Sequence, residues 1–161
     1  KPFFLFYRIL NPHSPFRFDA DCSRIFEGET ITEELYLGQL RCVSSQIVSA
    51  IDVIRESDPS AIIVVQSDHG FMTVQQLGYS PKQWTEVEKL NAFSNFSAFL
   101  LPRQCRDQVY NGLSPVNTFR VVFGCIDGEQ YPLLPDVSYL TTWPFDRSSE
   151  REIFPWEPPG E

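Results

Sequence analysis

The sequence predicts an α/β fold with a mainly parallel sheet sandwiched by helices. Residues 2–10, PFFLFYRIL, form a continuous apolar run, and residues 61–67, AIIVVQS, form a second one rich in β-branched side chains. Short runs of this kind are typical of strands buried on both faces, as in parallel sheets. A long helical pattern separates the two runs, so strand, helix and strand are expected to form one right-handed crossover unit.

The helix between these strands is expected over residues 30–57. Thr30 and Glu33 match the capping-box pattern, and apolar residues then recur at helical spacing. The Asp58-Pro59 pair ends the helix, because a residue before proline disfavours helical backbone angles. The apolar stripe consists of Tyr36, Leu40, Val43, Ile47, Ala50, Ile51 and Ile54. Before this helix, residues 11–29 are expected to form a long polar loop.

Further elements are expected in the second half of the chain. Residues 95–102 alternate in polarity and then become apolar, which predicts a third strand. Short helices are expected near residues 84–89 and 103–110. Ser114 and Pro115 match an N-cap followed by proline at the first helical position, which predicts another helix.

Composition and charge restrict the function classes. The chain has 161 residues, 42% of them hydrophobic, and is long enough to bury a core. Its formal net charge of -8 argues against a nucleic-acid-binding surface, although a bound cation can reverse the field locally for an anionic substrate. No stretch approaches the roughly 20 apolar residues of a membrane span. Residues 1–147 are assigned to the α/β domain and residues 148–161 to a Pro-rich acidic tail.

The cysteines Cys22, Cys42, Cys105 and Cys125 lie far apart and form no Cys-x-x-Cys motif, which argues against a zinc ribbon. This spacing favours scattered reduced thiols. One or two disulfides remain open for an extracytoplasmic protein. Cys22 lies near Arg24, but we interpret it as a half-buried structural residue rather than an activated thiol.

The most informative stretch is VVQSDHGF, residues 64–71, in which an apolar strand ends on Asp68 and His69, followed by Gly70. The other histidine, His13, also follows an apolar run. Ligands of open α/β sheets bind beyond the carboxyl ends of the strands, so parallel strands would bring both histidines to one edge. A carboxylate oxygen and a neutral imidazole nitrogen are a partial ligand set for a divalent cation. Gly70 would allow a sharp backbone turn; in the plainer alternative, Asp-His-Gly is only a turn.

Three segments, in this order, resemble sulfatase-like hydrolases of the alkaline phosphatase superfamily. NPHSPFRFD resembles the family's Pro-His-x-Pro-Phe segment, and IIVVQSDHG resembles its strand ending in Asp-His-Gly. LSPVNTFRVVF followed by YPLLPDVSY resembles a segment common in bacterial members. The resemblance covers most of residues 3–140 and implies an alkaline-phosphatase-like fold, of which this chain would be the C-terminal part.

The resemblance also implies roles for the matched positions. Asp68 and His69 would bind a divalent metal ion (zinc, manganese, magnesium or calcium), and His13 would contact the phosphate or sulfate group of the substrate, or a metal. The family's nucleophile and first metal-binding aspartate are not identifiable here, so we expect a partial catalytic domain without its N-terminal half. The substrate would be a small-molecule or lipid-linked ester, and the parent protein extracytoplasmic or membrane-anchored.

Two functions stay open: part of a metal-dependent hydrolase or transferase acting on phosphate or sulfate esters, and a non-catalytic α/β module that binds a metal or a partner. Ser67 and His69 are not interpreted as a nucleophile pair, because the chain has no Gly-x-Ser-x-Gly elbow. For Glu86 and Glu88 the pattern favours a solvated helix face over metal ligation. For Arg120 it favours a structural ion pair over anion binding.

Overall fold

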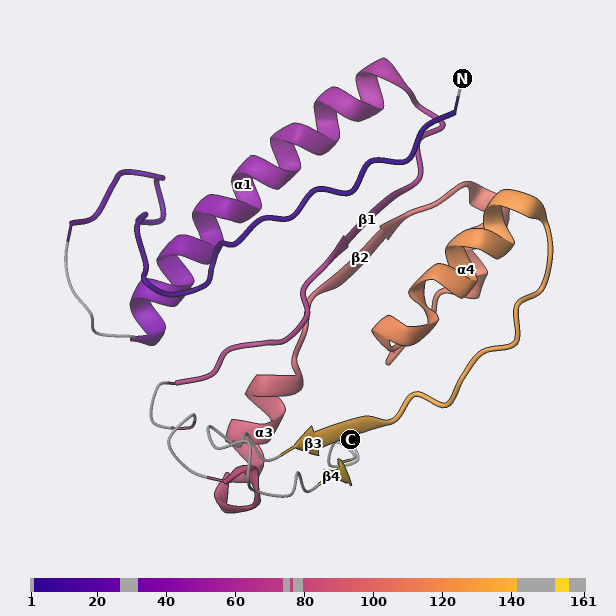
Figure 1. Cartoon of the computed structure of the whole chain (residues 1–161). Coiled ribbons are helices and arrows are strands. Elements are labelled where there is room, and N and C mark those ends of the chain that lie inside the picture. The colour runs from indigo at the N-terminus through magenta and orange to yellow at the C-terminus, as the bar shows by residue number, and fades with distance from the viewer. Residues whose placement is uncertain (1, 27–31, 74–75, 77–79, 142–152, 157–161) are drawn as a thin grey trace. The chain divides into compact units, whose positions relative to one another are not determined.

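The structure is a computed structural model, and it describes residues 2–26, 32–73, 76, 80–141 and 153–156 (Figure 1). The chain divides into two compact units, Lys1–Ser57 and Asp58–Glu161. Within the described ranges, no helix combines the length and hydrophobicity of a bilayer-crossing segment.

The first unit is built on helix α1, Glu33–Ser57. Thr32 Oγ1 accepts a hydrogen bond from the Leu35 N–H at 3.2 Å, which satisfies one of the free donors at the start of the helix. Acidic side chains in the first turn and Arg55 in the last turn complement the helix dipole. The predicted helix is therefore confirmed. The predicted cap, Thr30, lies outside the described residues.

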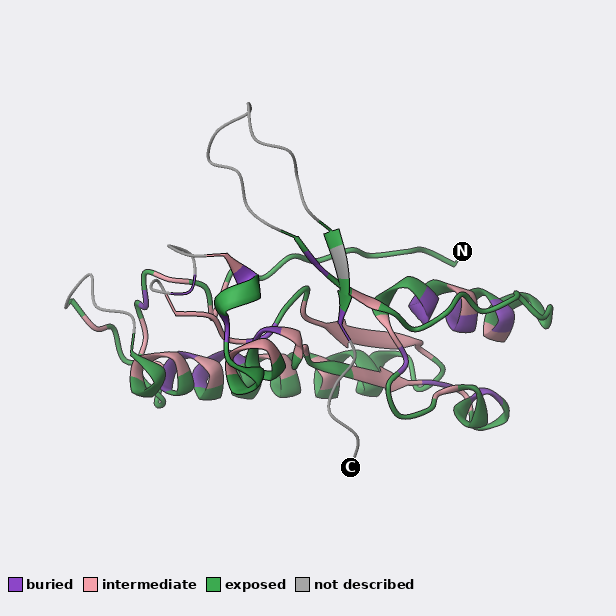
Figure 2. Cartoon of the chain, turned by 90° about the horizontal axis from the view of Figure 1, so that it is seen from below, coloured by how far each residue is buried: buried purple, intermediate pink, exposed green. Residues whose placement is uncertain are grey.

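Residues 2–10 do not form the predicted strand. The segment has no strand assignment, and its large side chains are exposed, from Ile9 at 40% to Phe3 at 87% (Figure 2). The prediction of a buried strand is wrong. An apolar run indicates that burying a segment would be favourable, but it does not show that a neighbouring strand is there to pair with it. A buried strand needs backbone hydrogen-bond partners as well as apolar side chains.

The predicted strands at 61–67 and 95–102 are present, but they pair with each other. Strand β1, Ile63–Gln66, runs antiparallel to β2, Ser97–Leu100. Ile63 lies opposite Leu100, and Gln66 lies opposite Ser97. All four residues of β1 are only half-buried, as expected for an antiparallel pair with incomplete cover.

The predicted fold class is therefore wrong. In the described part of the chain the strands form two antiparallel pairs, β1–β2 and β3–β4, instead of one mainly parallel sheet sandwiched by helices. Strand β3, Ser138–Thr141, pairs with β4, Ile153–Trp156. Hydrophobic periodicity identifies a strand but not its direction or partner, and the partner of β1 follows it along the chain rather than preceding it.

The helices of the second unit lie close to their predicted positions. A short 3-10 helix, η1, spans Pro81–Gln83, and α3 spans Glu86–Phe93 behind a capping box of Thr85 and Glu88. A second 3-10 helix, η2, spans Arg103–Gln108. Helix α4 spans Pro115–Asp127, with Ser114 as N-cap and proline at the first helical position. It ends at Gly128, whose φ of 78° favours glycine.

Two apolar clusters lie in the second unit. The first contains Trp84, Ala92, Leu140 and Trp156, with Met72 and Phe93 packed against it. Within it the Phe93 and Trp156 rings stack with centroids 4.6 Å apart. The second contains Leu101, Cys105, Leu113 and Val121, and it joins β2 and η2 to α4. The first cluster joins α3 to both strands of the β3–β4 pair, and it packs near the stretch that follows Asp68 and His69.

Candidate functional site

The end of β1 is fixed by hydrogen bonds that continue the β1–β2 ladder past Gln66. The Ser67 N–H donates to the Phe96 carbonyl oxygen at 2.9 Å, and the Phe96 N–H donates to Ser67 Oγ at 2.7 Å. The Ser67 side chain thus holds the strand end. Asp68 follows directly and is exposed, so the chain leaves the sheet at a defined point with its carboxylate available.

Gly70 is buried because it lies against the last turn of α3. Its N–H donates to the Ala92 carbonyl oxygen at 2.8 Å. A Cβ at this position would lie 2.0 Å from the Asn91 carbonyl oxygen and 2.8 Å from that of Ser94. Gly70 is not among the glycines with positive φ. Its role is close backbone approach, and the expectation of a sharp glycine turn is replaced by this contact.

His69 is exposed, and its ring is oriented by the neighbouring backbone. Nδ1 lies 2.7 Å from the Gly70 carbonyl oxygen. A carbonyl oxygen only accepts, so in this hydrogen bond Nδ1 carries the proton. The neutral ring then has its lone pair on Nε2, which makes no hydrogen bond to the described residues. This is the arrangement of a metal-ligating histidine whose second nitrogen donates to a backbone carbonyl.

The described residues do not complete a metal site. They contain no group of three or more His, Cys, Asp or Glu side chains that could hold a metal ion. Two acidic residues of α3 have other partners: Glu86 accepts from Lys89 Nζ at 2.7 Å, and Glu88 closes the capping box with Thr85. Asp68 and His69 therefore have side chains that suit a metal ion, but the described part of the chain supplies no third ligand.

Arg120 forms no ion pair with the described residues, so the predicted ion pair is not seen among them. Its Nε donates to the Pro132 carbonyl oxygen at 3.1 Å, and its Nη1 donates to that of Val116 at 2.8 Å. The guanidinium thus joins α4 to the segment after it through backbone oxygens. The structural interpretation holds, but its partners are carbonyl groups rather than a carboxylate.

His13 lies in the first unit, in a loop attached to α1. It is exposed, and its Nδ1 lies 2.5 Å from the Ser14 carbonyl oxygen. Its own carbonyl oxygen accepts from Gln39 Nε2 at 3.2 Å. The backbone of His13 is therefore held on the helix, while its ring extends into solvent.

His13, Asp68 and His69 were predicted to meet at one edge of a parallel sheet, and that basis is wrong, because residues 2–10 form no strand and β1 runs antiparallel to β2. The meeting of the three side chains itself stays a prediction. His13 belongs to the unit Lys1–Ser57, and the other two residues belong to the unit Asp58–Glu161. A metal ion and a bridging anion would span roughly 10 Å between the two imidazoles, and this separation is a distance between the two units.

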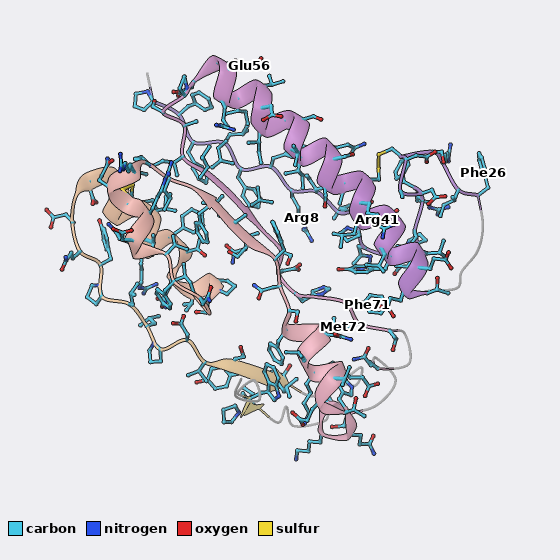
Figure 3. The ribbon with its side chains drawn as sticks, turned by 180° about the vertical axis from the view of Figure 1, so that it is seen from behind. Arg8, Phe26, Arg41, Glu56, Phe71 and Met72 are labelled. Carbon is cyan, nitrogen blue, oxygen red and sulfur yellow. A yellow bond between two sulfur atoms is a disulfide. The ribbon has the colours of Figure 1, made fainter. Side chains whose placement is uncertain are left out.

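The prediction of reduced cysteines is wrong. Cys22 is bonded to Cys42, and Cys105 is bonded to Cys125, with Cα atoms 4.9 Å and 5.6 Å apart (Figure 3). Sequence spacing indicated neither pair, because disulfide formation depends on the approach and direction of the Cβ atoms in the fold. The bonded state also removes the activated-thiol alternative for Cys22.

A polar cluster around Asp136 was not predicted from the sequence. Asp136 Oδ1 accepts from the Ser114 N–H at 2.8 Å and from Asn117 Nδ2 at 2.9 Å, and Oδ2 accepts from the Tyr110 hydroxyl at 2.5 Å. Desolvation raises the pKa of Asp136, but these hydrogen bonds outweigh it and lower the pKa to about 2. Asn117, fully buried, also bonds both backbone groups of Leu134. The cluster fastens the chain after α4 to the start of that helix.

Comparison with protein-family models, curated proteins and solved structures found no match for this chain. The resemblance to sulfatase-like hydrolases therefore rests on the three motif segments alone. The roles it implies for Asp68, His69 and His13 are taken up below as proposals.

Proposed function

We propose that this chain supplies part of the centre of a metal-dependent hydrolase or transferase that acts on phosphate or sulfate esters. Asp68 and His69 would ligate a divalent cation, and His13 would contact the ester's anionic group. One observation carries the proposal: Asp68 and His69 are exposed at the fixed end of β1, and His69 Nδ1 lies 2.7 Å from the Gly70 carbonyl oxygen, which leaves Nε2 for a metal.

The donor chemistry supports zinc or manganese, with magnesium or calcium as further candidates. A carboxylate oxygen suits all four ions, whereas a neutral imidazole nitrogen suits zinc and manganese better than the harder calcium or magnesium. A bound cation would act as a Lewis acid toward an ester oxygen. Two ligands leave coordination positions to be filled by residues beyond this pair, which agrees with a partial centre.

The hydrogen bond at His13 sets the charge with which it can hold an anion. Nδ1 donates to the Ser14 carbonyl oxygen, so only Nε2 remains for a ligand. Nε2 donates to a phosphate or sulfate oxygen only when it is protonated, which makes the ring an imidazolium. His13 therefore acts as a cationic contact, whereas His69 acts as a neutral ligand.

Calorimetric titration of the intact chain with zinc or manganese chloride tests the metal site. We expect wild-type protein to bind one ion, and His69→Ala and Asp68→Ala each to weaken binding about tenfold or more. Asp107→Ala is the matched control, because Asp107 is also an exposed aspartate of the second unit and its side chain makes no hydrogen bond to the described residues. Binding heats that are equal in wild type and His69→Ala would reject the site.

A further inference from the structure

The buried part of α1 faces a loop rather than an apolar core. The buried residues of this helix are Gly38, Gln39, Cys42 and Val43. Three of them contact the loop that carries His13. A Cβ on Gly38 would lie 3.2 Å from Asp19 Oδ1. Cys42 forms the disulfide with Cys22, and Gln39 hydrogen-bonds the loop backbone.

Gln39 is fully buried, and each end of its amide is used. Oε1 accepts from the Arg17 N–H at 2.6 Å and from the Phe18 N–H at 3.2 Å. Nε2 donates to the His13 carbonyl oxygen. A buried amide that is satisfied in this way fixes the position of its partners, since losing it leaves buried polar groups unpaired. One side chain of α1 thus holds the loop on both sides of Ser14 and Pro15.

The Cys22–Cys42 disulfide anchors the same loop one helical turn further along. Cys22 has a φ of 67°, a left-handed conformation that is uncommon for a residue with a Cβ. The turn around it is closed by the Cys22 N–H, which donates to the Asp19 carbonyl oxygen, and by the Ser23 N–H, which donates to Asp21 Oδ1. The covalent bond holds this turn against the helix, so the loop has two separate attachments to one face of α1.

We propose that Gln39 and the Cys22–Cys42 disulfide together position His13, and that the disulfide makes this positioning sensitive to redox conditions. The proposal rests on the anion-contacting role of His13 given above. Gln39 acts through the backbone of His13 and is a positioning residue.

The redox step needs only an external dithiol. Its thiolate attacks the sulfur of Cys22, which is half-buried, whereas Cys42 is 1% exposed. The S–S bond breaks, a mixed disulfide forms at Cys22, and Cys42 leaves as a thiolate that takes up a proton. The second thiol of the reagent then attacks the reagent's sulfur in this mixed disulfide. Cys22 is released as a thiol, and the reagent closes to a cyclic disulfide. Two electrons pass from the dithiol to the protein.

The chain contains its own control for this experiment. The Cys105–Cys125 disulfide has the same sequence separation of 20 residues but ties η2 to α4 in the second unit. Because loop-closure entropy depends on loop length, removing either disulfide changes the unfolded chain equally. The Cys22–Cys42 bond joins the loop of His13 to α1, whereas the Cys105–Cys125 bond joins two elements of the second unit.

Amide hydrogen exchange by NMR on the intact chain decides the positioning role. We expect the Arg17 and Phe18 amides to lose protection about tenfold or more in Cys22→Ser/Cys42→Ser and in Gln39→Leu, and to keep it in Cys105→Ser/Cys125→Ser. Dithiol reduction of wild type should reproduce the loss without a substitution. Equal protection in all variants, or an equal loss in the control pair, would overturn the proposal.

Titration with inorganic phosphate, followed at the His13 ring signals, decides the link to the anion. Phosphate affinity should fall about fivefold or more in the first two variants and stay unchanged in the control pair. Amide protection could fall as expected while the His13 ring signals do not respond to phosphate in wild type or in any variant. In that case the positioning of the loop is supported and the anion-contacting role of His13 is rejected. The two proposals can therefore fail separately.

Discussion

Replacing Gly70 by alanine should displace the Asp68–His69 pair from its fixed position. The added Cβ would lie 2.0 Å from the Asn91 carbonyl oxygen, roughly 1 Å or more inside an ordinary van der Waals contact. The obstacle is helix backbone rather than a flexible side chain, so Gly70 itself must move. Its hydrogen bond to the Ala92 carbonyl oxygen, 2.8 Å long, would then break.

The size of the effect follows from these two contacts. Overpacking against backbone costs about 1–3 kcal/mol, and a lost backbone hydrogen bond adds about 1 kcal/mol. We therefore expect Gly70→Ala to lower the free energy of unfolding of the second unit by about 2–4 kcal/mol. The metal affinity proposed for Asp68 and His69 should fall with it, because the residue that follows them no longer fits against α3.

Urea denaturation followed by tryptophan fluorescence measures this loss, since Trp84 and Trp156 both lie in the cluster packed on α3. Gly112→Ala is the control. Gly112 has a φ of 81°, and a Cβ added to it would meet nothing within 4 Å, so its replacement costs only about 1 kcal/mol of backbone strain. A Gly70→Ala protein as stable as Gly112→Ala, or more stable, would refute the close-approach argument.

Two further outcomes are expected. Replacing either disulfide by a serine pair should lower the free energy of unfolding of its unit by about 3 kcal/mol, measured by denaturation with and without a dithiol, because both close loops of similar length. The folded-state pKa of Asp136, about 2, lies below the ordinary aspartate value of 3.8. The stabilisation that ionised Asp136 gives the fold is therefore complete above pH 3.8 and is lost as the pH falls toward 2. The difference in free energy of unfolding between wild type and Asp136→Asn should shrink over that window. A difference that stays constant would contradict the lowered pKa of Asp136.

Local elements of this protein were predictable where their signals are local. Helices α1 and α4 follow from apolar spacing, and α4 also from Ser114 and Pro115 at its start. Strands β1 and β2 follow from their apolar runs. Their antiparallel pairing did not follow, because a short apolar run reads the same in either direction and with any partner.

The residues of the candidate site were proposed from the sequence and stay a prediction, whereas the contacts that support them were not predicted. Asp68, His69 and His13 are the residues that chemistry singles out, since carboxylate and imidazole side chains after a strand are conspicuous in a sequence. Gln39 carries no such signal, because a glutamine on a helix is ordinarily exposed. The contact between Gly70 and α3 depends on which segments lie side by side in the fold, and so does the pairing of the cysteines. The spacing of residues along the sequence does not predict either of them.

The exposed segment at residues 2–10 has a practical consequence for work with this chain. It combines aromatic and aliphatic side chains over more than six residues, with Arg8 as its one charge and Pro2 only at its edge. Such a window, exposed on a folded protein, is prone to intermolecular cross-β association. Arg8 therefore acts as a gatekeeper, and Arg8→Ile should lower the protein concentration at which turbidity and thioflavin fluorescence rise. A second charge in the same window, as in Phe6→Lys, should raise that concentration and give the preparations needed for the binding measurements.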